Sequence, residues 1–287
     1  MKKQAGILKG ARAAVAAEAE ALARAVAAGD GGNLSEAERI ARDVVAKNPQ
    51  QLEALQLLGA LLMGQKRLRE AVAPLEEAAR RSPNPELETH LAIALREIGR
   101  TDEALAWFYR AIERQPAYAR AFQELGNLLR AMRRYAEAET VLKRGLEAAP
   151  TVAELSLALG GVCLDRADSP GAKVAFARAL SIVPGNADAL VGFGIALQYE
   201  GDFARAAERF RRVLARDPGH HRARMNLGYC LIELGQQDEG IACLRAAVQA
   251  APHNYGTALR MLIGAGRGRF WLNRSAAAAC LGFNAKP

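Results

Sequence analysis

The sequence has few of the residues that bind metals or carry out covalent catalysis. Its 287 residues include four cysteines and four histidines, with no CxxC pair and no histidine at metal-ligand spacing from a cysteine. The zinc-protease motif HExxH, the nucleophile motif GxSxG and the phosphate-binding P-loop are all absent. The sequence therefore predicts a protein that is not an enzyme and that needs no cofactor or metal.

Long apolar runs are also missing, and residues that favour strands are sparse. No stretch of 18 apolar residues occurs, and Lys9 and Arg12 interrupt the segment that follows the basic start Met1–Lys3. Aromatic residues make up only 6%, whereas the helix formers Ala, Leu, Arg and Glu are abundant. These features predict an all-α protein without a membrane span or an export signal. The few scattered thiols favour a cytoplasmic location.

Acidic residues are scarce in the last third of the chain. The whole sequence has 39 basic and 31 acidic residues, and residues 201–287 hold 13 of the basic but only 6 of the acidic ones. Most of the basic residues are Arg, whose planar group binds carboxylate or phosphate with two hydrogen bonds. Two interpretations stay open: ordinary solubility with charged helix ends, or a surface for an acidic partner.

The dominant pattern is an internal repeat of 33 or 34 residues. Twelve residues before each repeating proline lies a small residue, from Ala37 in the first repeat to Gly240 in the last. A pair such as Leu58-Gly59 opens most repeats. The repeating prolines are Pro49, Pro83, Pro116, Pro150, Pro184, Pro218 and Pro252.

Each repeat has the pattern of two helices joined by a turn. Apolar residues at repeat positions 4, 7, 8 and 11 share one face of the first helix, and those at positions 20, 24 and 27 share one face of the second. Gly or Ala at positions 8 and 20 lets the helices approach closely, and the proline at position 32 ends the second helix. In the fifth repeat, Ser169 is predicted to cap the second helix. In the first, Arg24 occupies an apolar position, so a shift by two residues is predicted, with Leu22, Ala23 and Val26 packing instead.

This combination of small, large and proline positions resembles the tetratricopeptide repeat (TPR) family. The resemblance covers residues 18–254 and implies an all-α fold, a right-handed α-α superhelix or TPR solenoid of about seven helix-turn-helix repeats, closed by a C-terminal capping helix. Residues 1–17 would extend the first helix, and residues 255–287 would form the capping helix and a tail. The predicted repeats are 18–51, 52–84, 85–118, 119–152, 153–186, 187–220 and 221–254.

The resemblance also implies where a ligand binds. In the family, a second stripe on each first helix faces a concave groove that holds peptides. Here the stripe is polar and net basic in repeats three and four, and small and apolar in repeats five and six. The candidate groove residues are His90, Ile93, Arg120, Gln123, Asn127, Leu157, Gly161, Val191, Ile195, Arg222, Asn226 and Tyr229. Two alternatives stay open: these residues contact the neighbouring repeat, or the chain's own tail fills the groove.

The resulting hypothesis is a scaffold or adaptor that binds an extended or helical segment of another protein. The alternative is binding of nucleic acid or an anionic membrane through the basic C-terminal third, where Arg267, Arg269 and Arg274 accompany Phe270 and Trp271. The preferred interpretation of that segment is a tail that packs on the last helix, because exposed consecutive apolar residues are unfavourable. The sequence identifies neither the partner nor the oligomeric state.

Overall fold

The computed structural model describes residues 2–264 and 274–282; of residues 2–14 and Arg274 only the backbone is described. Across these residues the chain forms α-helices and one short 3-10 helix, with no strand. The helices are α1 (Lys2–Asp30), α2 (Leu34–Lys47), α3 (Leu52–Gly64), α4 (Leu68–Arg81), α5 (Pro85–Glu97), α6 (Thr101–Ile112), α7 (Ala119–Ala131), α8 (Tyr135–Ala148), α9 (Ala153–Asp165), α10 (Ser169–Ile182), α11 (Ala187–Tyr199), α12 (Phe203–Arg216), α13 (His221–Glu233), α14 (Gln237–Ala250), η1 (Pro252–Asn254), α15 (Tyr255–Gly264) and α16 (Arg274–Cys280).

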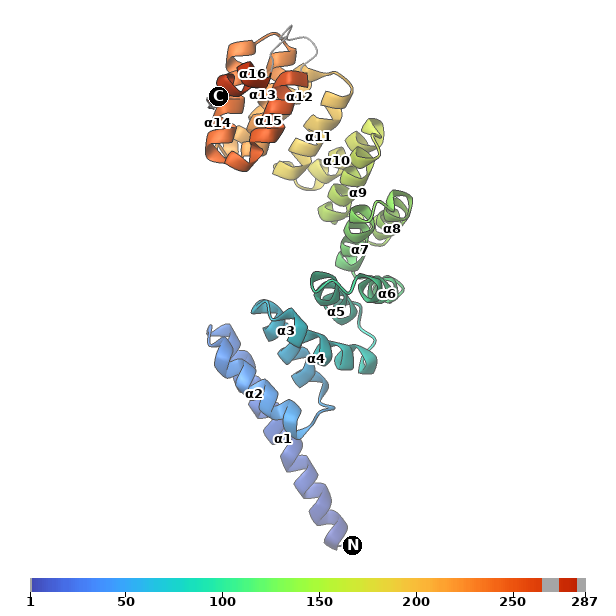
Figure 1. Cartoon of the computed structure of the whole chain (residues 1–287). Helices are drawn as coiled ribbons and strands as arrows, with labels where there is room; N and C mark the ends of the chain where they lie inside the picture. The colour runs from blue at the N-terminus through green and yellow to red at the C-terminus, as the bar shows by residue number, and fades with distance from the viewer. Residues whose placement is uncertain (1, 265–273, 283–287) are drawn as a thin grey trace. The chain divides into compact units, whose positions relative to one another are not determined.

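The chain divides into two compact units, residues 1–125 and 126–287, called here the N-terminal and C-terminal units. Within each unit, consecutive helices pack as a row of hairpins (Figure 1). From α3 on, each predicted repeat contains one such pair of helices. The predicted all-α solenoid of helix pairs is therefore confirmed, while the exact repeat boundaries stay a prediction. No helix among the described residues is long and apolar enough to cross a membrane.

The turn inside each helix pair has one residue with a left-handed backbone. Four of these residues are glycines, which adopt positive φ without steric cost. The other three carry side chains, and Ala167 has a φ of 58°. The seven residues are Gly32, Lys66, Gly99, Arg133, Ala167, Gly201 and Gly235.

Short polar side chains cap some of the helix starts. Asn84 caps α5 by accepting a hydrogen bond from Glu86 N at 2.8 Å. The prediction that Ser169 caps α10 is wrong: Asp168 is the cap and accepts from Gly171 N at 2.9 Å. Ser169 is instead the first residue of the helix and is buried.

The glycines at repeat position 8 lie directly against the second helix, as predicted. A Cβ atom on Gly59 would lie 2.5 Å from Leu75, and one on Gly160 would lie 2.6 Å from the ring of Phe176. The same ring also faces the next helix pair, where a Cβ on Gly192 would lie 2.3 Å from it. These contacts explain the recurring small residues, because any side chain there would push the helices apart.

The first helix departs from its predicted register. Leu22 packs in a small core with Val44 and Ala54, and Ala25 is fully buried. Ala23 and Val26, which were expected to pack, are exposed. The two-residue shift is therefore wrong: the original register holds at Ala25, and the long loop does not displace it.

The end of the chain covers the last repeat. Ala258 and Leu262 of α15 and Ala277 and Leu281 at α16 share one buried cluster with α13 and α14. Arg245 donates two hydrogen bonds to the carbonyl oxygen of Cys280, at 2.8 and 3.0 Å, and so satisfies the end of α16. The expected packing of Phe270, Trp271 and Leu272 falls outside the described residues.

Candidate binding surfaces

In the N-terminal unit, the predicted stripe lies on α5 and the start of α7. His90 and Gln123 are half-buried and Arg120 is exposed. Ile93 is buried in the core, so the prediction that it faces a groove is wrong. His90 and Arg120 are close enough to interact electrostatically. Burial and then Arg120 lower the pKa of His90, while Glu86 opposes the shift. The imidazole is therefore neutral at pH 7, so it can both donate and accept a hydrogen bond.

A pocket of about 230 Å³ lies between α3 and α5 in the same stripe. His90 is one wall, and Gln56 and Ala60 of α3 form the other. Gln56 and Ala60 are not among the predicted groove residues, although they occupy stripe positions 5 and 9 of the second repeat. The full lining is Gln56, Ala60, Leu75, Asn84, Glu86, Leu87 and His90.

The predicted basic character of this stripe is partly neutralised. Glu124 accepts a hydrogen bond from Arg96 at 2.7 Å and lies 3.7 Å from Arg120. Arg96 also contacts Glu97 at 2.8 Å. The stripe therefore offers neutral polar groups and one exposed guanidinium, that of Arg120, rather than a strongly cationic surface.

In the C-terminal unit, the structure divides the predicted residues into two groups. Asn127, Leu157, Ile195 and Tyr229 are half-buried, so part of each side chain reaches the surface, and Arg222 is exposed. The edge of the Tyr229 ring contacts Phe203, with the ring centres 5.9 Å apart. Burial and then Glu233 raise the pKa of Tyr229 to about 12, so its hydroxyl stays a hydrogen-bond donor at neutral pH.

The second group packs inside the solenoid. Val191 is only 1% exposed and belongs to a core cluster of α11, α12 and α13. Gly161 is covered by the guanidinium of Arg130, which bonds Asp165 at 2.6 Å. The prediction that Val191 and Gly161 face an open groove is therefore wrong, because neighbouring side chains cover both residues.

The side-chain amide of Asn226 also forms a hydrogen bond inside the protein. Its side chain is buried and donates to the carbonyl oxygen of Arg222 at 2.8 Å. Gln198, another stripe residue, donates to the carbonyl oxygen of Asn226 at 3.1 Å. The alternative that stripe residues contact the neighbouring repeat thus holds for part of the stripe.

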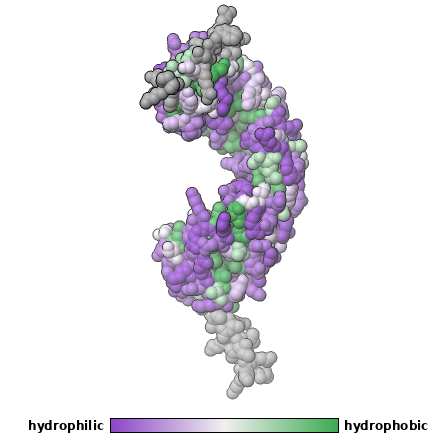
Figure 2. Space-filling view, viewed as in Figure 1, coloured by the Kyte–Doolittle hydropathy of each residue, from purple (hydrophilic) through white to green (hydrophobic). Residues whose placement is uncertain are grey.

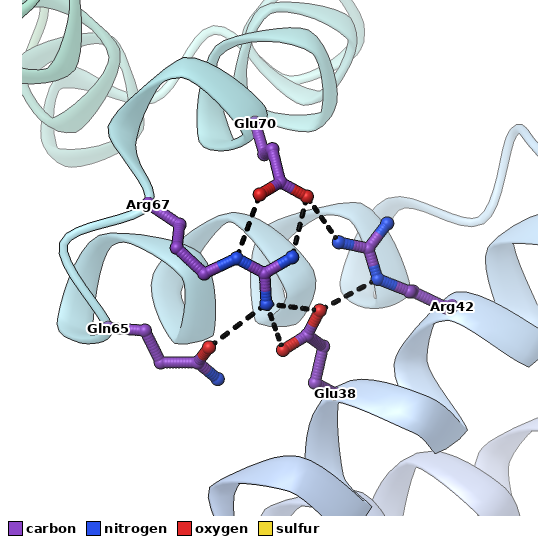
Figure 3. A network of polar contacts seen from close by, with 5 residues as sticks. All are labelled: Glu38, Arg42, Gln65, Arg67 and Glu70. Atoms are coloured by element: carbon purple, nitrogen blue, oxygen red, sulfur yellow. Dashed lines mark hydrogen bonds and ion pairs between the residues drawn. The ribbon is translucent and has the colours of Figure 1, made fainter.

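A charged cluster between α2 and α4 consists of acidic and basic side chains that bind one another (Figure 3). Arg67 donates to both oxygens of Glu70, at 2.6 and 2.8 Å, and to Glu38 at 2.7 Å. Arg42 joins the same two carboxylates at 2.8 and 2.9 Å, and Gln65 accepts from Arg67 at 3.1 Å. The cluster therefore connects the two helix pairs.

The arginines of α12 form fewer ion pairs than those of the charged cluster. One face of α12 carries Arg205, Arg209, Arg212 and Arg216, spaced four, three and four residues apart. Among the described residues, only Arg205 forms an ion pair, with Asp202 at 3.2 Å, and Arg209 lies over the ring of Phe193. Hydrophilic residues dominate the visible surface of both units (Figure 2). The described residues contain no group of three His, Cys, Asp or Glu side chains that could hold a metal.

Sequence-family models identify the repeat. Models described as tetratricopeptide repeat match residues 22–85, 95–160 and 191–255. The chain belongs to the tetratricopeptide repeat family. The matched TPR segments together cover more than half of the chain and include every candidate groove residue except His90, Ile93 and Gly161. No curated protein sequence matches this chain.

Solved structures of TPR proteins share the fold. A tetratricopeptide repeat protein from Parabacteroides merdae aligns with a TM-score of 0.64 and 19% identity, over 85% of this chain and 97% of its own. Pseudomonas aeruginosa pilF aligns with a TM-score of 0.60 and 19% identity, over 70% and 92%. YrrB, described as a TPR protein with an unusual peptide-binding site, aligns with a TM-score of 0.54 and 24% identity, over 66% and 97%. At these identities the likeness extends to the fold alone.

Proposed function

We propose that this TPR protein is a non-enzymatic adaptor that binds a peptide segment of another protein on the stripe of its first helices. The observation that carries the proposal is that six stripe residues stay half-buried after the repeats have packed: His90, Gln123, Asn127, Leu157, Ile195 and Tyr229. Partly exposed apolar and neutral polar side chains are the usual means of holding a peptide with affinity and register.

Each unit carries its own kind of contact. The pocket beside His90 offers a neutral imidazole and the amide of Gln56, which suit the backbone of an extended peptide. Leu157, Ile195 and Tyr229 offer apolar surface for side chains. The peptide-binding description of YrrB supports this use of the fold. We also propose a cytoplasmic location, which the four free thiols favour.

A displayed peptide library tests the proposal. We expect the wild-type chain to enrich a family of peptides and Ile195→Asp to weaken their binding by more than about 30-fold, since a buried apolar contact would be replaced by a charge. Val183→Asp is the matched control, because Val183 is 43% exposed at the end of α10 and lies off the stripe. Equal loss in both variants, or no enriched peptide with the wild-type chain, would contradict the proposal.

A second candidate function is the binding of nucleic acid or an anionic membrane, and the face of α12 favours it. Three of its four arginines have no described carboxylate partner, so they can contact phosphates. Arg267, Arg269 and Arg274, the earlier candidates, have side chains outside the described part of the chain. Binding through phosphate contacts alone should be weak and lost by about 0.2 M salt. A salt-resistant complex with RNA or anionic vesicles, abolished by Arg212→Glu with Arg216→Glu, would favour this function over the adaptor.

A further inference from the structure

A second cavity lies on the opposite set of helices, away from the stripe. It has a volume of about 390 Å³, lies between α8 and α10, and has α9 as its floor. Most of its walls are apolar, including Leu146, Leu159, Val174 and Ala175. All of its lining residues belong to the C-terminal unit: Glu139, Lys143, Leu146, Ser156, Leu159, Cys163, Asp168, Pro170, Gly171, Val174, Ala175 and Arg178.

The cavity exists because the fifth repeat is small at two packing positions. Ser156 stands at repeat position 4, where the neighbouring repeats carry Phe122 and Leu190. Ala175 stands at position 23, where they carry Val141 and Arg209. The smaller side chains leave open a volume that larger side chains would occupy.

One polar atom inside this apolar space is unsatisfied. Ser156 is 0% exposed, it lines the cavity, and its hydroxyl has no hydrogen-bond partner in the described structure. A buried hydroxyl without a partner is destabilising, and native structures rarely leave one. A bound molecule with one hydrogen-bonding group would satisfy it.

The charged residues at the rim are already engaged. Glu139 binds Lys143 at 2.7 Å and also pairs with Arg166. Asp168 accepts from Gly171 N, and Arg178 donates to the carbonyl oxygen of Pro150 at 3.1 Å. The two acidic and two basic lining residues also cancel in charge, so the rim selects neither an anion nor a cation.

Cys163 lines the cavity, but its thiol is a poor nucleophile. Burial, followed by Asp168 and Glu139, raises the pKa of its thiol to about 11, so the nucleophilic thiolate is scarce at neutral pH. The cavity is therefore suited to binding rather than to covalent chemistry.

We propose that this cavity binds a small uncharged molecule with an apolar ring and one hydroxyl group, which bonds the hydroxyl of Ser156. The volume lies in the range of small-molecule sites, and an apolar wall with one convergent polar group is their usual composition. This site is independent of the peptide stripe, since none of its lining residues belongs to that stripe.

Phenol and toluene are the probes, because they share a ring and differ in the hydroxyl. We expect the wild-type chain to bind phenol about tenfold more tightly than toluene, the effect of one net hydrogen bond. Amide chemical shifts in NMR should change at Ser156, Cys163 and Val174. Ser156→Ala should remove the preference for phenol while leaving toluene binding in place.

Narrowing the cavity should weaken the binding of both probes. Ala175→Val introduces the side chain that α8 carries at the same repeat position, so the fold should tolerate it. Ala177→Val is the matched control, since Ala177 is exposed on the same helix. If Ala175→Val fails to fold, Ser156→Leu narrows the cavity from α9 with the residue found in repeats two and six.

Three outcomes would overturn the proposal. The first is that neither probe shifts these amides at millimolar concentration. The second is that a folded Ala175→Val or Ser156→Leu variant binds phenol as tightly as the wild-type chain does. The third is that a peptide enriched from the library displaces phenol and loses affinity in Ala175→Val, which would assign the cavity to a partner's side chain.

Discussion

The same repeat joins its neighbours by charge in one region and by an aromatic ring in another. Between α2 and α4, Glu38, Arg42, Arg67 and Glu70 form a closed set of ion pairs (Figure 3). Between α9 and α11, the ring of Phe176 lies against Gly160 and Gly192, accompanied by one partly exposed pair, Lys173 and Glu200. The repeat pattern therefore fixes the path of the helices but not the interaction that holds them together.

Glu88 is a second case in which equivalent repeat positions are stabilised by charge in one repeat and by apolar packing in another. Glu88 occupies an apolar packing position of the third repeat, is 0% exposed, and is paired with Arg114 at 2.9 Å and Arg110 at 3.4 Å. Arg110 also lies over the ring of Trp107. The sixth repeat has the apolar Leu190 at the position of Glu88. A buried carboxylate is tolerated only while its partners remain, so these arginines are structural.

The largest expected effect comes from removing the ring. Phe176→Ala should destabilise the C-terminal unit by about 3–5 kcal/mol, because it leaves a cavity between two helix pairs that cannot close easily. The loss should not depend on salt concentration. Denaturant unfolding followed by amide exchange in residues 153–199 measures it, with the exposed Val174→Ala as control. A loss under about 1 kcal/mol would show that the ring is not what joins the pairs.

Acidification should affect the N-terminal unit first. Hydrogen bonds from Arg42 lower the pKa of Glu38, and those from Arg67 lower the pKa of Glu70, below their ordinary value of 4.5. The stabilisation is therefore complete above about pH 4.5 and is lost as the pH falls below it. Faster amide exchange in residues 34–81 than in residues 169–216 at low pH would support this.

The control for that experiment is Glu38→Gln, which should weaken the pH dependence of residues 34–81 without changing that of residues 169–216. High salt should act in the same direction as acid on the first segment, since screening weakens exposed ion pairs. Identical pH profiles in the two segments would contradict the contrast between them.

The smallest expected effect is at a turn. Ala167 has a φ of 58°, whereas glycine fills the same position in four other repeats. Ala167→Gly should stabilise the α9–α10 pair by up to about 1 kcal/mol, because glycine relieves the left-handed strain but loses more entropy on folding. Thermal unfolding measures the change, and a matched Ala177→Gly substitution inside α10 should be destabilising by a similar amount.

The period of the sequence was enough to predict the fold, because each repeating position has one steric role. Proline ends the second helix, and small residues let the two helices pack closely. The positions of Gly160 and Pro184 are filled by small residues and by proline in every repeat, so this recurrence alone reveals the helix pairs. The candidate site was predicted less well. The side chain of Val191 lies on the stripe by spacing, yet the neighbouring helices bury it, and spacing within one helix does not report contacts between helices.

Other features depended on pairs of residues far apart in sequence. Glu88 gave no sign of burial, since its partner Arg114 lies 26 residues away. The cavity beside Ser156 could have been found from the sequence, because Ser156 and Ala175 are both smaller than their equivalents in the adjacent repeats. Comparing each repeat with its neighbours, rather than with the average repeat, would have revealed it.

The double contact of Phe176 also limits how this chain can be rearranged. Among the seven repeats, only the sixth has glycine at position 6, where the others carry Ala23, Leu57, His90, Glu124, Ala158 and Asn226. Any of those side chains would clash with the ring of Phe176, because a Cβ atom at Gly192 would lie only 2.3 Å from it. The fifth and sixth repeats therefore form an inseparable pair, and a duplication, deletion or transplant of modules between them would produce a clash unless both partners moved together.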